Sequence, residues 1–135
     1  MEKKQDIQSR PEIEKLVHVF YGKLLDDALL APIFLEVAKI DLPKHLPILF
    51  DFWESVLFQA GKYKNNALEI HLDLHLEHRL EEAHFERWLV LFNETVDELF
   101  EGEKAKQAKG TALSIATIIK MKIDNLERMR LELNN

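Results

Sequence analysis

Apolar residues recur at steps of three and four along most of the chain, which is the spacing of one buried face of an α-helix. The stripes lie within residues 9–26, 41–61, 85–102 and 103–129. Only four glycines and four prolines are present, which favours long regular elements over loops. These patterns predict an all-α domain of about five or six helices with short connections.

Residues typical of helix ends mark the first element. Glu12 follows Ser9 at the spacing of a capping box, and Pro11 stands in the first turn, where its missing N–H is not needed. Asp26 and Asp27 then interrupt the apolar stripe. We therefore expect a helix that starts after Ser9 and ends at this acidic pair.

A proline complicates the second helix. Asp41 is a suitable cap and Pro43 suits a first turn. If the helix began at Leu42, Pro47 would remove an internal hydrogen bond at a cost of ~3 kcal/mol or more. We therefore expect an irregular first turn or a regular helix that starts near His45, with unusual backbone around His45 in either case.

The fourth stripe contains a glycine in its interior. Gly110 interrupts the pattern of Ala108, Ala112, Ile115 and Ile119. A glycine inside a helix is less favourable than alanine by ~1 kcal/mol. We therefore expect a close contact with a neighbouring element at Gly110.

Length and composition describe one soluble globular domain. The 135 residues, 47% of them hydrophobic and 31% charged, are enough for a single core over 1–135. Frayed tails are expected over about 1–8 and 130–135. The absence of cysteine excludes disulfides, thiolate metal sites, iron–sulfur clusters and covalent haem attachment, and is consistent with a reducing compartment.

Charge and hydropathy narrow the partners. A net charge of −6 disfavours binding to a phosphate backbone, so no nucleic-acid partner is expected. No stretch approaches the 18 consecutive apolar residues of a membrane span, and no signal peptide is visible at the N-terminus. We expect a cytoplasmic protein without a membrane partner.

Four residues with polar tips stand on or near the apolar stripes: Tyr21, His45, His71 and Trp88. Taken one at a time, each is most often a structural residue of a core or a helix end. Haem, however, needs a slot between helices, an imidazole below the iron and selected polar groups above it. Together these residues favour a haem pocket with His71 as the metal ligand.

Several segments resemble the truncated haemoglobins, and most closely the third group of that family. The resemblance extends over roughly Ile13 to Ile123, and the paired-glycine motifs of the other groups are missing here, as they are in third-group members. The segments that carry it are Phe20-Tyr21, Pro32-Ile33-Phe34, His45 with Phe52-Trp53, His71-Leu72-Asp73-Leu74, and residues 85–92.

The resemblance implies a globin-like two-over-two helical sandwich around haem b (iron protoporphyrin IX). His71 matches the proximal iron ligand, whereas Tyr21, His45 and Trp88 match the residues that line the distal side. Pro47, so soon after His45, is a departure that puts the pose of the His45 side chain in question. The apolar residues expected to contact the haem are Phe34, Leu49, Phe50, Trp53, Leu74 and Ile115.

The expected ligands are oxygen, nitric oxide, carbon monoxide or peroxide. The Tyr21 hydroxyl and the Trp88 indole N–H are donors that would hold oxygen, and two or three such bonds would slow its release by roughly ten- to a thousandfold. Slow release suits peroxidase-like or nitric-oxide-dioxygenase-like chemistry, which implies an electron-donating reductase. A monomer or weak dimer is expected, and whether the chain is a catalyst stays open.

Two other functions compete with haem binding. His71, Asp73, His75 and His78 fall within eight residues, and His71 and His75 would share a helical face suited to zinc, copper or nickel. A non-haem metal protein would leave Tyr21 and Trp88 without a role. The second alternative is a helical interaction module with no cofactor.

Overall fold

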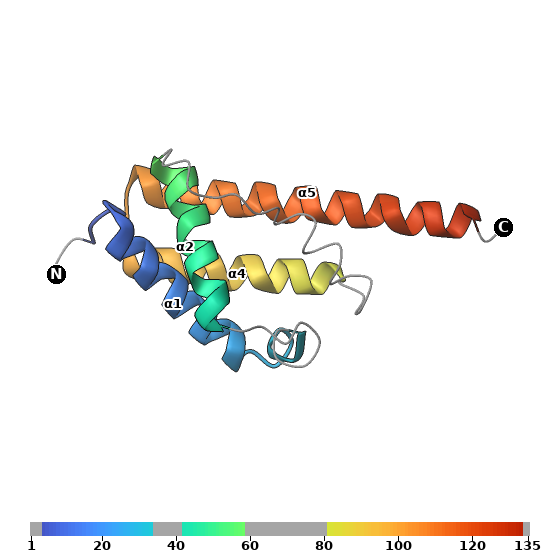
Figure 1. The fold of residues 1–135 in the computed structure, drawn as a ribbon, viewed down its shortest axis with the longest axis horizontal. Helices are drawn as coiled ribbons and strands as arrows, with labels where there is room; N and C mark the ends of the chain where they lie inside the picture. The colour runs from blue at the N-terminus through green and yellow to red at the C-terminus, as the bar shows by residue number, and fades with distance from the viewer. Residues whose placement is uncertain (1–3, 34–41, 59–80, 134–135) are drawn as a thin grey trace.

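A computed structural model describes residues 4–33, 42–58 and 81–133 of the chain (Figure 1). Within these ranges the structure contains four long helices and no strand, which confirms the all-α prediction. The helices are α1 (Arg10–Asp26), α2 (Leu42–Phe58), α4 (Glu82–Leu99) and α5 (Glu103–Leu133).

The helices form two packed pairs. In Figure 1, α4 and α5 run side by side, and α2 crosses them. Helix α1 packs on both α2 and α4, while α5 packs on α4 and touches α2. Ion pairs from Lys109 to Asp97 and from Lys120 to Glu82 place α4 antiparallel to α5. The α1–α2 pair therefore lies on the α4–α5 pair, as the two-over-two prediction requires.

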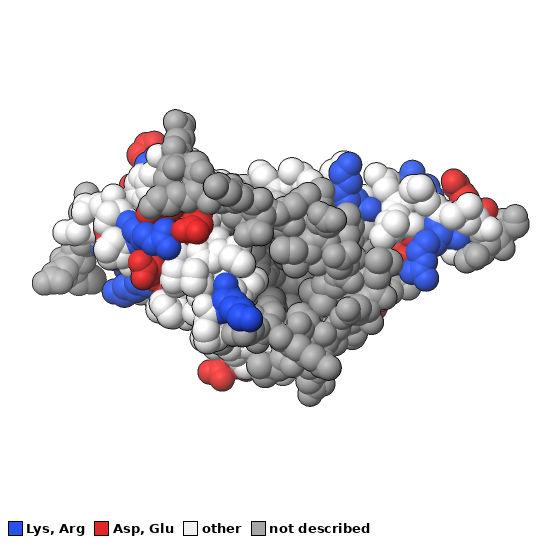
Figure 2. Space-filling view, viewed as in Figure 1, with Lys and Arg blue, Asp and Glu red and all other residues white. Residues whose placement is uncertain are grey.

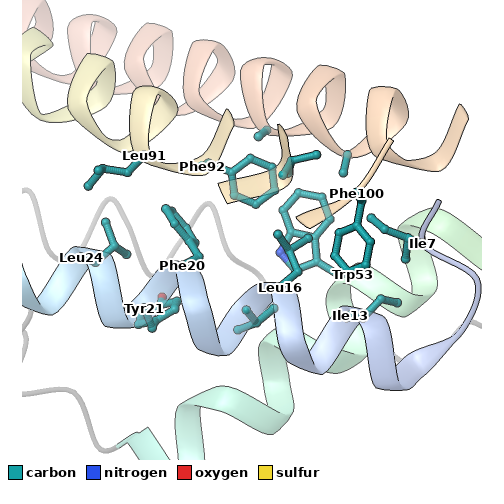
Figure 3. Packing of buried hydrophobic residues seen from close by; sticks show 14 of the residues in the cluster. Ile7, Ile13, Leu16, Phe20, Tyr21, Leu24, Trp53, Leu91, Phe92 and Phe100 are labelled. Carbon is teal, nitrogen blue, oxygen red and sulfur yellow. The ribbon is translucent and has the colours of Figure 1, made fainter. Parts of the chain in front are cut away.

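Aromatic side chains form the core between α1, α2 and α4, whereas small side chains fill the interface between α4 and α5. Figure 3 shows side chains from α1 meeting Phe92 and Leu91 of α4. Helix α5 buries alanines on this face, and small side chains let helix axes approach closely. These alanines are Ala105, Ala108, Ala112 and Ala116.

The ends of α1 follow the prediction in position but not in detail. Ser9 is the N-cap and Asp26 the last helical residue. The Ser9 side chain makes no capping bond to the backbone, and its hydroxyl instead donates to a Glu12 carboxylate oxygen at 3.2 Å. Glu12 also accepts the Gln8 N–H at 3.2 Å. The predicted capping box is therefore wrong, because the serine hydroxyl is engaged by the carboxylate.

The expectation for the second helix is wrong. Helix α2 begins at Leu42 and continues through Pro47 without a break. The hydrogen bond that Pro47 cannot donate would go to the Pro43 carbonyl, which lies in the first turn. Both prolines are exposed, so water can satisfy that carbonyl and the helix need not start later. His45 is consequently held on a regular helix.

Three further expectations are corrected. Residues 4–8 are not frayed, because Ile7 is buried and the Asp6 carboxylate accepts the backbone N–H groups of Lys104 and Ala105, each at 2.8 Å. At the other end, α5 stays helical to Leu133. Gly110 is exposed, and no described side chain lies within 4 Å of the place where a Cβ would stand, so it marks no close contact.

The visible surface mixes charges of both signs. Figure 2 shows basic and acidic side chains interspersed on this face and on the projecting end of α5. Lys23 of α1 pairs with Glu94 and Glu98 of α4, at 3.2 and 2.9 Å. None of the described helices is both long enough and apolar enough to cross a bilayer.

Candidate functional site

Two of the predicted site residues meet where α1 and α2 contact each other. Tyr21 lies on the buried face of α1, with 8% of its surface exposed, and His45 is half-buried near the start of α2. The Tyr21 hydroxyl and the His45 Nε2 atom are 2.9 Å apart, a hydrogen-bond distance. The two rings meet edge to face, with centroids 5.5 Å apart. The fold thus joins residues that are far apart in sequence.

The protonation of this pair decides what it can offer. Burial raises the pKa of the Tyr21 hydroxyl well above its usual range, because the core disfavours a phenolate. Tyr21 therefore keeps its proton at all physiological pH values. If His45 Nε2 carries no proton, Tyr21 donates to it. If Nε2 is protonated, it donates to the Tyr21 oxygen, and the Tyr21 O–H can turn toward a third atom.

Phe20 links Trp88 to the Tyr21–His45 pair, because its ring contacts both Trp88 and Tyr21. The Trp88 ring, half-buried on α4, stacks on Phe92 with centroids 5.7 Å apart and planes 9° apart. Phe20 meets the same indole edge to face at 5.6 Å, and its own neighbour in sequence is Tyr21. Within the described ranges, the Trp88 indole N–H makes no hydrogen bond, so it keeps its capacity to donate.

Four of the expected haem contacts are described. Trp53 is buried and stacks on Phe92, with centroids 5.1 Å apart, so it forms part of the core between α2 and α4. Phe50 packs on His18 at 5.5 Å and lies under the Arg10 guanidinium at 5.7 Å. Both rings thus have protein partners, and their contact with a cofactor stays a prediction. Leu49 and Ile115 are half-buried on α2 and α5.

The remaining predicted residues lie outside the described ranges. They include the proposed iron ligand His71 and the expected haem contacts Phe34 and Leu74. The competing metal site, with Asp73, His75 and His78 added to His71, lies outside as well. Among the residues that are described, no group of three or more metal-binding side chains comes together.

Comparison with known proteins assigns the family. A group 3 truncated haemoglobin, ctb of Campylobacter jejuni, is 31% identical over 98 residues, which cover 70% of this chain and 75% of that protein. The crystal structure of a group III truncated haemoglobin from Campylobacter jejuni superposes with a TM-score of 0.78 at 27% identity, over 90% of this chain and 95% of that one. No family model matches the sequence.

This chain belongs to the group 3 truncated haemoglobins. The structural likeness extends over nearly the whole chain, so the truncated-globin fold predicted from the sequence is confirmed. The finer predictions concern what the protein binds and which residues bind it.

The described residues of this truncated haemoglobin fit a haem with a small polar ligand. Tyr21, His45 and Trp88 supply a phenol, an imidazole and an indole N–H, the donor types that suit a diatomic ligand. The Phe20 ring lies against both Tyr21 and Trp88. A low-dielectric surrounding strengthens each hydrogen bond that these donors make.

Sequence reasoning missed the importance of Phe92. Only 1% of its surface is exposed, and its ring contacts Phe20, Trp53 and Trp88. The helical stripe predicted that Phe92 faces inward and lies beside Trp88, four residues earlier, but periodicity along one helix carries no information about the rings that other helices bring. In this truncated haemoglobin, α1 and α2 each bring a ring to this side chain of α4.

Proposed function

We propose that this truncated haemoglobin binds haem b without a covalent link and, through it, diatomic ligands such as oxygen and nitric oxide. Family membership supports the proposal. The observation that carries it is the buried Tyr21 hydroxyl, hydrogen-bonded to His45 across α1 and α2 inside an aromatic core. A phenol in such surroundings suits a polar ligand atom better than it suits packing alone.

His71 would hold the iron through a neutral imidazole nitrogen, as the resemblance implies. When bound, the haem supplies an iron centre that takes up diatomic ligands reversibly. Phe34, Leu49, Phe50, Trp53, Leu74 and Ile115 are proposed as apolar contacts of the ring. These assignments rest on the match of the sequence to the family.

The chain's own donors determine how long a ligand stays. Tyr21 keeps its proton because burial raises its pKa, and its O–H can donate to a ligand when His45 Nε2 carries a proton of its own. Trp88 has an indole N–H without a partner in the described ranges. One such bond contributes on the order of 1 kcal/mol, and up to ~3 kcal/mol with a charged acceptor. His45 orients the Tyr21 hydroxyl and can carry a proton to or from it.

Slow release defines the class of function. Each ~1.4 kcal/mol slows dissociation about tenfold. A protein that holds oxygen this way suits chemistry on oxygen, peroxide or nitric oxide better than bulk carriage, and that chemistry would need an electron-donating reductase. Carbon monoxide serves as the spectroscopic ligand. We further propose that the protein is located in the cytoplasm and is a monomer or a weak dimer.

Absorption spectra of the haem-reconstituted chain test the proposal. We expect a Soret band, stoichiometric haem uptake and a shifted ferrous spectrum with carbon monoxide. His71→Ala should weaken haem binding and alter the ferrous spectrum, whereas Lys15→Ala, which removes an exposed side chain on α1, should not. A colourless wild type that takes up zinc would instead support the site of His71, Asp73, His75 and His78.

A further inference from the structure

Phe92 of α4 contacts rings from α1 and α2 as well as the proposed ligand donor, Trp88. The ring of Phe92 stacks on Trp53 of α2 with centroids 5.1 Å apart and planes 17° apart. The Phe92 ring also stacks on Trp88, with centroids 5.7 Å apart and planes 9° apart. Figure 3 shows Phe92 descending from α4 toward Phe20 of α1, whose edge it meets at 5.1 Å. Phe92 is therefore in contact with three aromatic rings.

The orientation of the Trp88 indole depends on these neighbours. The second side-chain torsion of an aromatic residue is broad, so packing rather than torsional preference sets the ring plane. Phe92 supplies the parallel face, and Phe20 meets the indole at 74°. No hydrogen bond within the described ranges assists in holding the indole N–H. The direction of that N–H follows from the aromatic contacts.

We propose that Phe92, backed by Trp53, is a positioning residue that aims the Trp88 indole N–H into the ligand pocket. The inference rests on the proposed function, since it assigns the N–H to a ligand. Trp53 then acts at a distance, as support for Phe92. Phe20 serves both donors, because its ring contacts the rings of Tyr21 and Trp88.

Phe92→Leu removes the stack while leaving an apolar side chain in the core. In the haem-free chain, the 15N-labelled indole N–H resonance of Trp88, assigned by its loss in Trp88→Phe, should shift and broaden. Val96→Ala is the matched control, since Val96 is fully buried one turn further along α4 and belongs to no aromatic contact. It should lower stability and leave the Trp88 resonance in place.

The loaded protein gives the second readout. Phe92→Leu should speed oxygen dissociation about fivefold, the effect of losing one hydrogen bond. It should have no further effect in a Trp88→Phe background, because a positioning residue acts only through the group it positions. Phe92→Met, whose flexible side chain adapts to irregular gaps in a core, replaces Phe92→Leu in both assays if the leucine variant does not fold.

Two results would overturn the proposal: an indole resonance unchanged by removal of the Phe92 ring, or equal acceleration of oxygen release with and without the Trp88 indole. Failure of the proposed function looks different. A wild type without a Soret band would refute haem binding, while the indole resonance of the same haem-free chain would still report whether Phe92 orients Trp88.

Discussion

The corner between α4 and α5 and the aromatic junction of α1, α2 and α4 differ in how their polar atoms are hydrogen-bonded. At the corner, the Asp6 carboxylate accepts the backbone N–H groups of Ile7, Lys104 and Ala105, each at 2.8 Å. Gly102 turns there with φ +142°, and its missing Cβ leaves room for Asp6. The polar groups of this corner are therefore hydrogen-bonded to one another within the protein.

At the junction, Tyr21 and His45 are hydrogen-bonded to each other, and the Trp88 N–H has no hydrogen-bond partner in the described parts of the chain. Polar groups that are saturated internally contribute to stability, whereas donors with capacity left over can bind a ligand. Changes at the corner should therefore alter unfolding and not ligand release, whereas changes at the junction should alter ligand release as well as stability.

The largest expected effect on stability is at Gly102. A Cβ at this position would lie 2.6 Å from the Asp6 Cγ atom, and φ +142° is unfavourable for alanine. Strain and the disturbed cap together should lower the free energy of unfolding of Gly102→Ala by about 3 kcal/mol. Urea unfolding measures this loss.

Gly110→Ala is the matched control, because Gly110 is an exposed helical position with no described atom in the way. It should gain about 1 kcal/mol, the difference in helix propensity between the two residues. Equal effects of the two substitutions would refute the role assigned to the corner. Neither variant should change the spectrum of the carbon monoxide complex.

Asp6→Ala should have the next largest effect, a loss of about 2 kcal/mol at neutral pH. Burial acts to raise the pKa of Asp6, but the hydrogen bonds from three backbone N–H groups outweigh it, so the pKa lies below its ordinary value. A lowered pKa means that this contribution is complete above about pH 4, the unfolded aspartate value, and is lost as the pH falls through the folded value.

Urea unfolding of wild type and Asp6→Ala at pH 7 and near pH 3 tests this sign. The difference in stability between the two proteins should shrink at the lower pH. A difference that stays constant or grows would contradict the account of the cap.

The two regions also differ in how far the sequence could predict them. The helical stripes predicted α1, α4 and most of α5, and the inward position of Tyr21, because periodicity reports which face a helix buries. Asp6 gave no such signal, since its partners Lys104 and Ala105 lie at the other end of the chain. Local patterns placed residues 1–8 in a frayed tail for that reason.

Pro47 and Phe92 show two other limits. An average cost for proline misplaced the start of α2, because the carbonyl deprived of a partner lies in an exposed first turn. Phe92 was placed on the correct face, beside Trp88 of its own stripe, but the rings of Phe20 and Trp53 that meet it come from two other stripes. Meetings between stripes are set by how helices cross, which no single stripe records.

Stopped-flow dissociation of oxygen from wild type and Tyr21→Phe tests the central claim most directly. Removing one buried hydroxyl should lower the free energy of unfolding by only about 1 kcal/mol but speed oxygen release about tenfold or more, because the ligand loses a donor that the core had kept protonated. Equal dissociation rates in the two proteins would contradict the account.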